Sequence, residues 1–215
     1  MTDPAEFWED RYRSDHGRVW SGRVNPAVAR EVADLAPGRA LELGSGEGGD
    51  ALWLAERGWT VTAVDISQTA LAVGAAEAAA RGVSDRIRWV QADLVAWHPD
   101  VEYDLVTSAF LHAPFEFPRA EILRRAASAV APGGTLLVVG HGEAPMDAGQ
   151  EPGSGHRHAA GGPALPTPDE VLASLDLDSA WRVETNAEVE RSATLPDGTV
   201  REVIDTVLRM RRAAP

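Results

Sequence analysis

Two side chains on which many enzymes rely are missing from this chain of 215 residues. Cysteine does not occur, so disulfides, thiolate metal sites and cysteine nucleophiles are excluded. Lysine does not occur either, because every one of the 20 basic residues is arginine. The P-loop lysine, the Schiff-base lysine and a lysine general base are therefore excluded as well.

Long apolar runs and positive charge are also scarce. No apolar run approaches the roughly 18 residues that a membrane helix needs, and the N-terminal sequence MTDPAEFWEDRYR is charged where a signal peptide would be apolar. The 33 acidic and 20 basic residues leave a formal net charge of −13, which repels phosphate backbones, and no basic stripe with interleaved aromatics is visible. We therefore expect a cytoplasmic protein, a monomer or homodimer, that binds a small molecule and neither a membrane nor nucleic acid.

The order of the expected elements indicates an α/β fold. Apolar and β-branched runs predict strands that alternate with helices, which is the pattern of a mainly parallel sheet covered on both faces. The expected strands are 40–43, 59–64, 87–90, 103–108, 134–140, 180–190 and 199–210. The expected helices are 26–36, 51–55, 68–81, 117–130 and 168–175. A turn signal at 196–198 indicates that the last two strands form an antiparallel hairpin.

Two segments stand apart from this alternation. Residues 1–37 are expected to form an N-terminal helical cap, in which Asn25 and Pro26 begin a helix that ends before Pro37. Residues 141–166 are rich in glycine, proline and histidine without periodicity, which is typical of a functional lid or a mobile excursion. We find no internal repeat and no second domain boundary, so residues 1–215 are expected to form one domain.

A glycine cluster lies between the first expected strand and the following helix. Glycine at such a place lets the backbone approach a ligand closely, and the helix start aims free N–H groups at that ligand. Gly44, Gly46 and Gly49 satisfy the G-x-G-x-x-G pattern. Asp65 lies about 20 residues further on, where a dinucleotide site places its ribose-binding carboxylate. A nicotinamide cofactor therefore has to be considered.

Two further carboxylates favour a different ligand. Glu42 lies within the first strand, where burying a carboxylate costs several kcal/mol unless a cationic ligand compensates. Asp93 follows the third strand and joins Asp65 at the carboxyl ends of the strands, where open α/β sheets bind ligands. The expected ligand carries positive charge, a ribose diol and an adenine, and little phosphate.

The motifs along the chain resemble those of a known family. They are ELGSGEG at 42–48, DIS at 65–67, ADL at 92–94, YDLV at 103–106 and PGG at 132–134. In this order and spacing they are similar to the motifs of class I S-adenosylmethionine-dependent methyltransferases, over residues 5–212. The aromatic N-terminal pattern and the phrase GEGGD at 46–50 resemble the thiopurine and tellurite-resistance branch. Members of that branch methylate small sulfur, selenium, tellurium or ring-heteroatom nucleophiles.

The resemblance implies S-adenosylmethionine as cofactor and a Rossmann-like, seven-stranded, mostly parallel sheet whose last strand is antiparallel. It assigns the methionine moiety to the glycine turn and Glu42, and the ribose hydroxyls to Asp65. It assigns adenine to Ile66, Asp93 and Leu94, and the sulfonium and substrate to residues after the fourth strand. The implied cofactor-binding residues are Tyr12, Trp20, Glu42, Gly44, Ser45, Gly46, Gly48, Asp65, Ile66, Ala92, Asp93, Leu94, Ser108, Ala109 and Phe110.

Two histidines are candidate catalytic bases. His112 and His141 each follow the carboxyl end of a strand near the expected transfer centre. His156 and His158 lie with His141 in or beside the long loop, but no acidic ligand is clearly placed with them, so no metal site is expected. Strongly nucleophilic acceptors need little help with deprotonation, so proximity and desolvation can supply most of the rate.

The leading hypothesis is methyl transfer from S-adenosylmethionine to a small apolar or heteroaromatic nucleophile, through sulfur, nitrogen, oxygen or a heavier chalcogen. Two alternatives stay open. A nicotinamide-dependent oxidoreductase would explain the G-x-G-x-x-G pattern, although no Tyr/Lys or metal-bound catalytic group is recognisable. A cofactor-binding interaction protein without catalysis would fit the lack of an identifiable catalytic residue.

Overall fold

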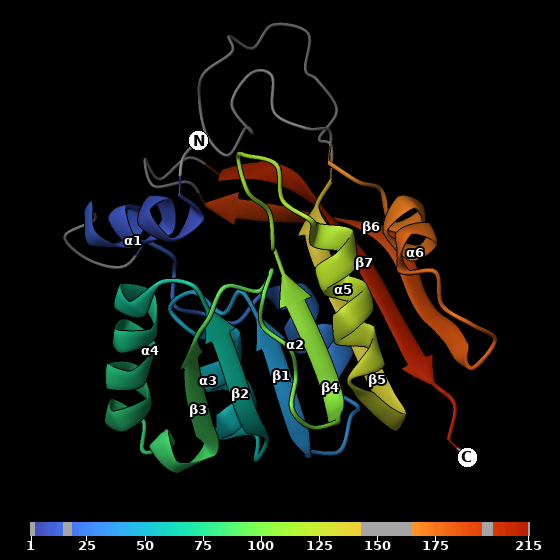
Figure 1. Ribbon diagram of the computed structural model, residues 1–215, viewed down its shortest axis with the longest axis horizontal. Helices are drawn as coiled ribbons and strands as arrows, with labels where there is room; N and C mark the ends of the chain where they lie inside the picture. The colour runs from blue at the N-terminus through green and yellow to red at the C-terminus, as the bar shows by residue number, and fades with distance from the viewer. Residues whose placement is uncertain (1–2, 15–18, 143–164, 195–199, 215) are drawn as a thin grey trace, which may run out of the picture.

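The centre of the computed structural model is a sheet of seven strands, and the structure describes residues 3–14, 19–142, 165–194 and 200–214 (Figure 1). The strand order across the sheet is β3-β2-β1-β4-β5-β7-β6. Neighbouring strands from β3 to β5 are parallel, and β7 runs antiparallel to both β5 and β6. The strands are β1 (Arg39–Leu43), β2 (Thr60–Asp65), β3 (Ile87–Gln91), β4 (Tyr103–Ala109), β5 (Val130–His141), β6 (Trp181–Thr194) and β7 (Val200–Arg212). The Rossmann-like sheet with an antiparallel last strand is confirmed.

Helices connect the strands and cover both faces of the sheet in the part of the chain that the structure describes. They are α1 (Pro4–Ser14), α2 (Pro26–Val32), α3 (Gly49–Glu56), α4 (Gln68–Ala80), α5 (Arg119–Ser128), α6 (Pro168–Leu175) and the short 3-10 helix η1 (Ser84–Arg86). The helix α1 packs against α4 and lies above it, at the end of the sheet to which the parallel strands point (Figure 1). Residues 1–37 therefore contribute two helices, and one of them reaches the ligand-binding edge.

The two faces of the sheet bury alternate residues of each strand, because side chains of a strand point in turn to opposite faces. Ala40 and Leu105 belong to the core formed with α2, α3 and the end of α4. Their neighbours Leu41 and Val106 belong to the core formed with α5 and α6. All four side chains are completely buried. With both faces occupied by helices, the carboxyl ends of the strands provide the place where loops can build a site.

The helices α2, α4 and α6 each begin at a side-chain cap. The side chain of Asn25 accepts two backbone N–H groups at the start of α2, and Ser67 accepts one at the start of α4. Thr167 and Glu170 form a reciprocal capping box at α6, with hydrogen bonds of 3.2 and 2.8 Å. Each cap satisfies N–H groups that the first helical turn leaves free, which contributes about 1 kcal/mol.

The helix predicted over 26–36 is shorter in the structure and ends at Val32. The guanidinium of Arg209 on β7 meets this end of the helix, and its Nη1 donates to the carbonyl oxygen of Glu31 at 2.6 Å. The same nitrogen pairs with Asp34 at 3.0 Å. A contact with a strand far along the chain therefore replaces the last helical turn.

The strand predicted over 134–140 begins earlier, at Val130. Val130 pairs with Tyr103 of β4 before the Pro-Gly-Gly turn, and the register shifts between Tyr103 and Leu105 to accommodate that turn. The expected loop over 141–166 lies almost entirely outside the described residues, which end at Gly142 and resume at residue 165. Among the described residues, no helix is both long and apolar enough to cross a membrane.

Candidate active site

The glycine turn after β1 is bent so that its backbone lies against two other segments. Gly44 and Gly46 both adopt positive φ, at 69° and 52°, a conformation that glycine takes without strain. A Cβ at Gly44 would lie 2.8 Å from Cδ1 of Leu111, and one at Gly46 would lie 2.8 Å from the hydroxyl of Tyr12. Side chains from the N-terminal helix and from the segment after β4 therefore meet at this turn.

Glu42 is the most unusual group beside the turn. Its side chain is 4% exposed, and its Oε2 atom has no hydrogen-bond partner among the described residues. Burial raises the pKa of this carboxyl well above its ordinary value, and the nearby charges of Asp50 and Asp65 raise it further. A buried carboxylate without a partner is costly, so the site favours either a proton or a cationic ligand at this oxygen.

Asp65 at the end of β2 fixes the shape of the turn. Its Oδ2 accepts the N–H of Gly46 at 2.7 Å, and its Oδ1 accepts the N–H of Ser67 at 2.9 Å. Burial raises the pKa of Asp65, while these hydrogen bonds act in the opposite direction. Each carboxylate oxygen keeps a second lone pair, so the expected ribose hydroxyls would share an acceptor that already orders the loop.

The N-terminal cap is fastened to the same loop. The hydroxyl of Tyr12 accepts a hydrogen bond from Nε1 of Trp20 at 3.0 Å, and burial next to Asp65 raises the pKa of Tyr12. Glu47 accepts the backbone N–H groups of Val19 and Trp20 at 3.1 and 3.0 Å. Asp50 accepts the N–H of residue 25 at 2.6 Å. Tyr12 and Trp20 thus lie against Gly46 of the glycine turn.

Sequence reasoning missed the part that Glu47 and Asp50 play. Acidic residues at the start of a helix are stabilised by its dipole, so the sequence alone gives neither residue a further part. The buried carboxylates bind backbone N–H groups more than 20 residues away, which no local pattern indicates. Glu9 on α1 was missed for the same reason. It accepts hydrogen bonds from Ser67 Oγ at 2.7 Å and from Thr69 Oγ1 at 2.6 Å.

The residues assigned to adenine come together beside Asp65. The N–H of Ala92 donates to the carbonyl oxygen of Asp65 at 2.9 Å, so the segment after β3 follows the end of β2. Ile66 is half-buried, Leu94 is buried and Asp93 is exposed, with its Oδ1 accepting a backbone N–H two residues on. These residues therefore provide one apolar surface and one solvent-facing carboxylate.

The residues after β4 lie on the other side of the glycine turn. Ser108 is buried, and its Oγ has no hydrogen-bond partner among the described residues. Phe110, next to Ala109, adopts a positive φ of 54°, and its ring stacks on His141 of β5 with centroids 4.1 Å apart. The ring centroids of His112 and His141 are 5.7 Å apart, and Nε2 of His112 accepts the backbone N–H of His141 at 3.5 Å. The structure therefore brings both candidate bases together at this edge.

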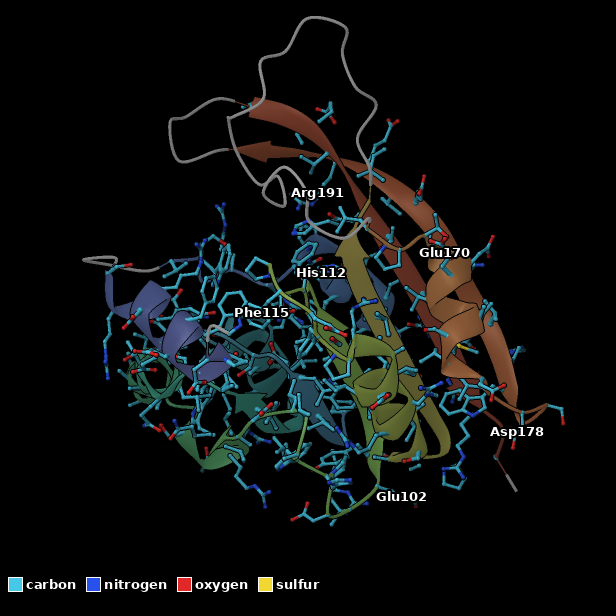
Figure 2. The ribbon with its side chains drawn as sticks, turned by 45° about the horizontal axis from the view of Figure 1, so that its top comes forward. Glu102, His112, Phe115, Glu170, Asp178 and Arg191 are labelled. Atoms are coloured by element: carbon cyan, nitrogen blue, oxygen red, sulfur yellow. The ribbon has the colours of Figure 1, made fainter. Side chains whose placement is uncertain are left out.

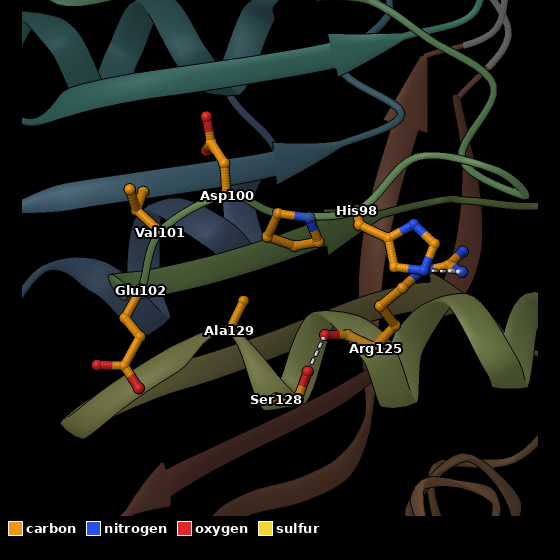
Figure 3. A pocket seen from close by; sticks show the side chains of 8 residues that line it. His98, Asp100, Val101, Glu102, Arg125, Ser128 and Ala129 are labelled. Atoms are coloured by element: carbon orange, nitrogen blue, oxygen red, sulfur yellow. Dashed lines mark hydrogen bonds between the residues drawn. The ribbon is translucent and has the colours of Figure 1, made fainter.

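Possible metal ligands and a surface hollow are two further features that bear on the location of a site. Within the described ranges, no set of three His, Asp or Glu side chains could hold a metal ion, and His156 and His158 lie outside those ranges. A hollow of about 300 Å³ lies between the segment before β4 and the end of α5 (Figure 3). It extends from His98 to Ala129 and reaches the amino-terminal end of β4, away from the glycine turn.

Comparison with known proteins finds a methyltransferase domain within the chain. Residues 40–134 match the family described as "Methyltransferase domain". The tRNA 5-carboxymethoxyuridine methyltransferase of Escherichia coli strain K12 is 32% identical over 145 residues, which are 64% of this chain and 54% of that enzyme. The chain thus spans about half the length of this curated relative.

Solved structures match over a larger share of the chain. A protein studied for conversion of a disulfide bond into a thioacetal group during echinomycin biosynthesis is 25% identical, with a TM-score of 0.69, 97% of this chain covered and 93% of that one. A SAM-dependent methyltransferase of Thiobacillus denitrificans, solved with S-adenosyl-L-homocysteine, is 25% identical with a TM-score of 0.50, covering 65% and 56%. TehB of Haemophilus influenzae shares the fold, at 17% identity and a TM-score of 0.64, covering 95% and 66%.

The motifs, the fold and these matches agree on one family. The matched range contains the glycine turn, Asp65 and Asp93, which the structure places together at the carboxyl ends of β1, β2 and β3. The sheet has the seven strands and the antiparallel last strand that the resemblance implies. Residues 40–134 carry a methyltransferase domain, and the motifs and fold of the chain resemble those of the class I S-adenosylmethionine-dependent methyltransferases.

Proposed function

We propose that this protein transfers the methyl group of S-adenosylmethionine to a small-molecule nucleophile. The observation that carries the proposal is the buried carboxylate of Glu42, whose Oε2 has no partner among the described residues and which adjoins the glycine turn. The ammonium group of a methionine moiety is the kind of ligand that would satisfy it. Asp65 and the apolar residues beyond β2 and β3 fit the ribose and adenine of the same molecule.

The residues that would hold the cofactor follow from this arrangement. Glu42 would lie opposite the methionine ammonium, and the backbone of Gly44, Ser45, Gly46 and Gly48 would surround the methionine. Asp65 would accept the ribose hydroxyls. Adenine would lie against Ile66, Ala92, Asp93 and Leu94, which form one surface beside Asp65. When bound, S-adenosylmethionine supplies an electrophilic methyl group on a sulfonium.

The rest of the chain would position the acceptor and exclude water. The nucleophile forms a bond to the methyl carbon while the carbon–sulfur bond breaks and its electron pair stays on sulfur. Tyr12 and Trp20 close the site over the turn, and removal of water favours the attack by desolvating the nucleophile. Ser108, Ala109 and Phe110 would border the reacting atoms. An acceptor that must lose a proton could pass it to His112 or His141, which adjoin this edge.

A binding measurement separates this proposal from a nicotinamide enzyme. We expect S-adenosylhomocysteine, at about a hundred times its dissociation constant, to add about 2.7 kcal/mol to the free energy of unfolding. NADH serves as the matched control and should leave the melting temperature unchanged. Stabilisation by NADH alone, or no binding of S-adenosylhomocysteine at millimolar concentration in a calorimeter, would contradict the proposed cofactor.

An acceptor screen tests catalysis and the small size of the substrate. Heterocyclic thiols, phenols and chalcogen oxyanions are the natural panel, because the aromatic N-terminal pattern resembles the thiopurine and tellurite-resistance branch and the fold is shared with TehB. Methylated product, detected by mass spectrometry, would eliminate the interaction protein without catalysis. Cofactor binding without any product would favour it.

A second candidate acceptor is RNA. It is favoured by the 32% identity to a tRNA methyltransferase of Escherichia coli, so the exclusion of nucleic acid finds no support among the relatives. The net charge of −13 opposes an RNA substrate, because phosphate backbones are repelled. Transfer of a labelled methyl group to total tRNA or rRNA, measured at 50 mM salt, distinguishes the two acceptors. Incorporation into RNA but into no member of the small-molecule panel would overturn the proposal.

A further inference from the structure

A cluster of rings and charges lies beyond the glycine turn, at the ends of β4 and β5. We refer to Phe110, His112, His141, Arg191 and Asp205 as the arginine cluster. Phe110 and His141 are stacked at 4.1 Å with an interplanar angle of 13°, and His112 continues the stack at 5.7 Å and 23°. Arg191 on β6 approaches the Phe110 ring, with its Cζ 5.9 Å from the centroid. Figure 2 shows Arg191 and His112 at the same end of the sheet.

Arg191 is held by one side of its guanidinium. Its Nε donates to Oδ2 of Asp205 at 2.6 Å, and the side chain is 27% exposed. Among the described residues, its two terminal nitrogens have no hydrogen-bond partner. A guanidinium fixed through Nε presents these two nitrogens as a fork, which matches the two oxygens of a carboxylate or similar oxyanion.

Asp205 fixes the position of the Arg191 side chain. It lies on β7 opposite His141 of β5, is 1% exposed, and its Oδ1 has no hydrogen-bond partner among the described residues. A second guanidinium, that of Arg30, also acts on this carboxylate. Arg30 is itself paired with Glu31 at 2.9 Å, so these groups leave no net charge. What the cluster offers a ligand is the pair of terminal nitrogens of Arg191, which a planar oxyanion can bind as a fork.

Backbone strain at Phe110 maintains the ring surface beside the arginine. A positive φ at a residue with a Cβ is strained, and such strain gathers at functional sites. The conformation is held by the Phe110 N–H, which donates to Val139 at 2.9 Å, and by the Phe110 carbonyl, which accepts from His112 at 2.8 Å. The ring is thereby stacked face to face on His141, and the Arg191 guanidinium lies beside this stack.

We propose that the methyl acceptor is a planar, anionic molecule whose ring packs beside the Phe110–His141 stack and whose carboxylate or other oxyanion binds the terminal nitrogens of Arg191. This inference rests on the proposed function, since it names the substrate class of the same site. The nucleophilic atom would lie on the side of the ring that faces Ser108 and the glycine turn. Arg191 would select the acceptor without taking part in bond making.

The test compares a charged ligand with its neutral isostere. We would titrate 4-(methylthio)benzoate and 4-(methylthio)benzamide, which stand for methylated products, into the protein saturated with S-adenosylhomocysteine, and repeat this with the 2- and 3-isomers. We expect at least one benzoate to bind at least tenfold more tightly than its amide. Arg191→Gln should reduce the benzoate affinity to that of the amide, whereas Arg191→Lys should retain part of the preference.

A matched control and the cofactor separate the possible failures. Arg182→Gln removes an arginine of the same strand whose side chain is 76% exposed, and it should leave the benzoate preference unchanged. Affinity for S-adenosylhomocysteine should stay within twofold in all variants. Equal binding of benzoates and amides, no binding of either, or a preference that survives Arg191→Gln would overturn the inference. If S-adenosylhomocysteine itself does not bind, the proposed function fails, and titration of the benzoates into the unliganded protein still decides the role of Arg191.

Discussion

The two halves of the sheet edge pair their buried carboxylates differently. Beside the glycine turn, Glu42, Asp50 and Asp65 are all buried, and none of the three forms an ion pair within the described residues. Beyond β4, the buried Asp205 is paired with Arg191, whose terminal nitrogens have no hydrogen-bond partner among the described residues. The first half favours a ligand with positive charge and the second a ligand with negative charge. The difference indicates that cofactor and acceptor are distinguished by electrostatics before any contact with the reacting atoms.

The physical basis of this contrast is the cost of burying charge. Removing a carboxylate from water without a nearby cation raises its pKa, as it does for Glu42. Either a proton or a cationic ligand can then compensate the buried charge. Asp205 is also buried, and burial raises its pKa, but the hydrogen bond from Arg191 opposes this change. Substitutions in the two halves should therefore change stability and binding in different directions.

The largest expected effect comes from Asp65→Ala. This change leaves the N–H groups of Gly46 and Ser67 without their acceptor in a buried turn, where each unpaired donor costs about 1–3 kcal/mol. We expect the free energy of unfolding, measured in urea, to fall by about 2–4 kcal/mol. Binding of S-adenosylhomocysteine should weaken by about 1–3 kcal/mol through lost charge-assisted hydrogen bonds.

Asp65→Asn is the matched control, because it keeps one acceptor oxygen. It should show a smaller loss of both stability and affinity. An unchanged dissociation constant for S-adenosylhomocysteine in Asp65→Ala would mean that the ribose lies elsewhere, and the acidic half would lose its main assigned contact.

The next effect is expected at Glu42, where stability and binding should change in opposite directions. Glu42→Gln replaces a buried carboxyl whose Oε2 has no partner among the described residues, so the free energy of unfolding of the unliganded protein should rise by about 1–2 kcal/mol. Affinity for S-adenosylhomocysteine should fall at least tenfold, because the methionine ammonium loses its counter-charge. Glu102→Gln, at an exposed position before β4, should change both by less than about 0.5 kcal/mol. A loss of stability in Glu42→Gln would contradict the account.

The pH dependence of stability tests the acidic half as a whole. Burial raises the pKa of Asp50 to about 6, and it also raises the pKa values of Glu42 and Asp65. A raised pKa in the folded state means that the folded protein binds more protons than the unfolded chain between the two values. The contribution of these protonated carboxyls to the free energy of unfolding is therefore complete below pH 4 and is lost as pH rises through about 6.

We expect these carboxyl groups to lower the free energy of unfolding of the unliganded protein by roughly 1–3 kcal/mol between pH 4 and pH 6.5. The midpoints of urea unfolding measure this change. Asp50→Asn should flatten the profile. With S-adenosylhomocysteine bound, the loss should be smaller, because the ligand favours the ionised form of Glu42. Stability that rises through this window in the unliganded protein would show that these carboxylates are already compensated.

The smallest expected effect concerns the N-terminal cap. Tyr12→Phe removes the hydroxyl that accepts the Trp20 N–H at 3.0 Å, which should cost about 0.5–1 kcal/mol of stability. Affinity for S-adenosylhomocysteine should fall only two- to threefold, because the ring still covers the glycine turn. A tenfold loss of affinity, measured by calorimetry, would instead place the hydroxyl in direct contact with the ligand.

Much of the fold was predictable because its signals are local. The caps at Asn25, Ser67 and Thr167 each depend on a single residue and its immediate neighbours, and all three are formed. The end of α2 was not predictable, because it depends on Arg209, a residue that reaches the helix from the other end of the chain.

The candidate site divides in the same way. The glycine turn and Asp65 could be found from spacing, since they follow consecutive strands and parallel strands end at one edge. Glu9, Glu47 and Asp50 could not be assigned, because their partners are backbone groups and hydroxyls of distant segments. Arg191 gave no signal either, as a single arginine in a strand predicts only a charged side chain.

By itself, the sequence determined the order of strands and helices, the α/β class and the resemblance to a family, because apolar period, caps and motif spacing are properties of neighbouring residues. It also determined that neither lysine nor cysteine takes part in catalysis. Only the tertiary structure decided which charges are buried and which meet. Burial and pairing depend on strand order and on contacts such as that between Arg191 and Asp205, whose energies arise only when the sheet has formed.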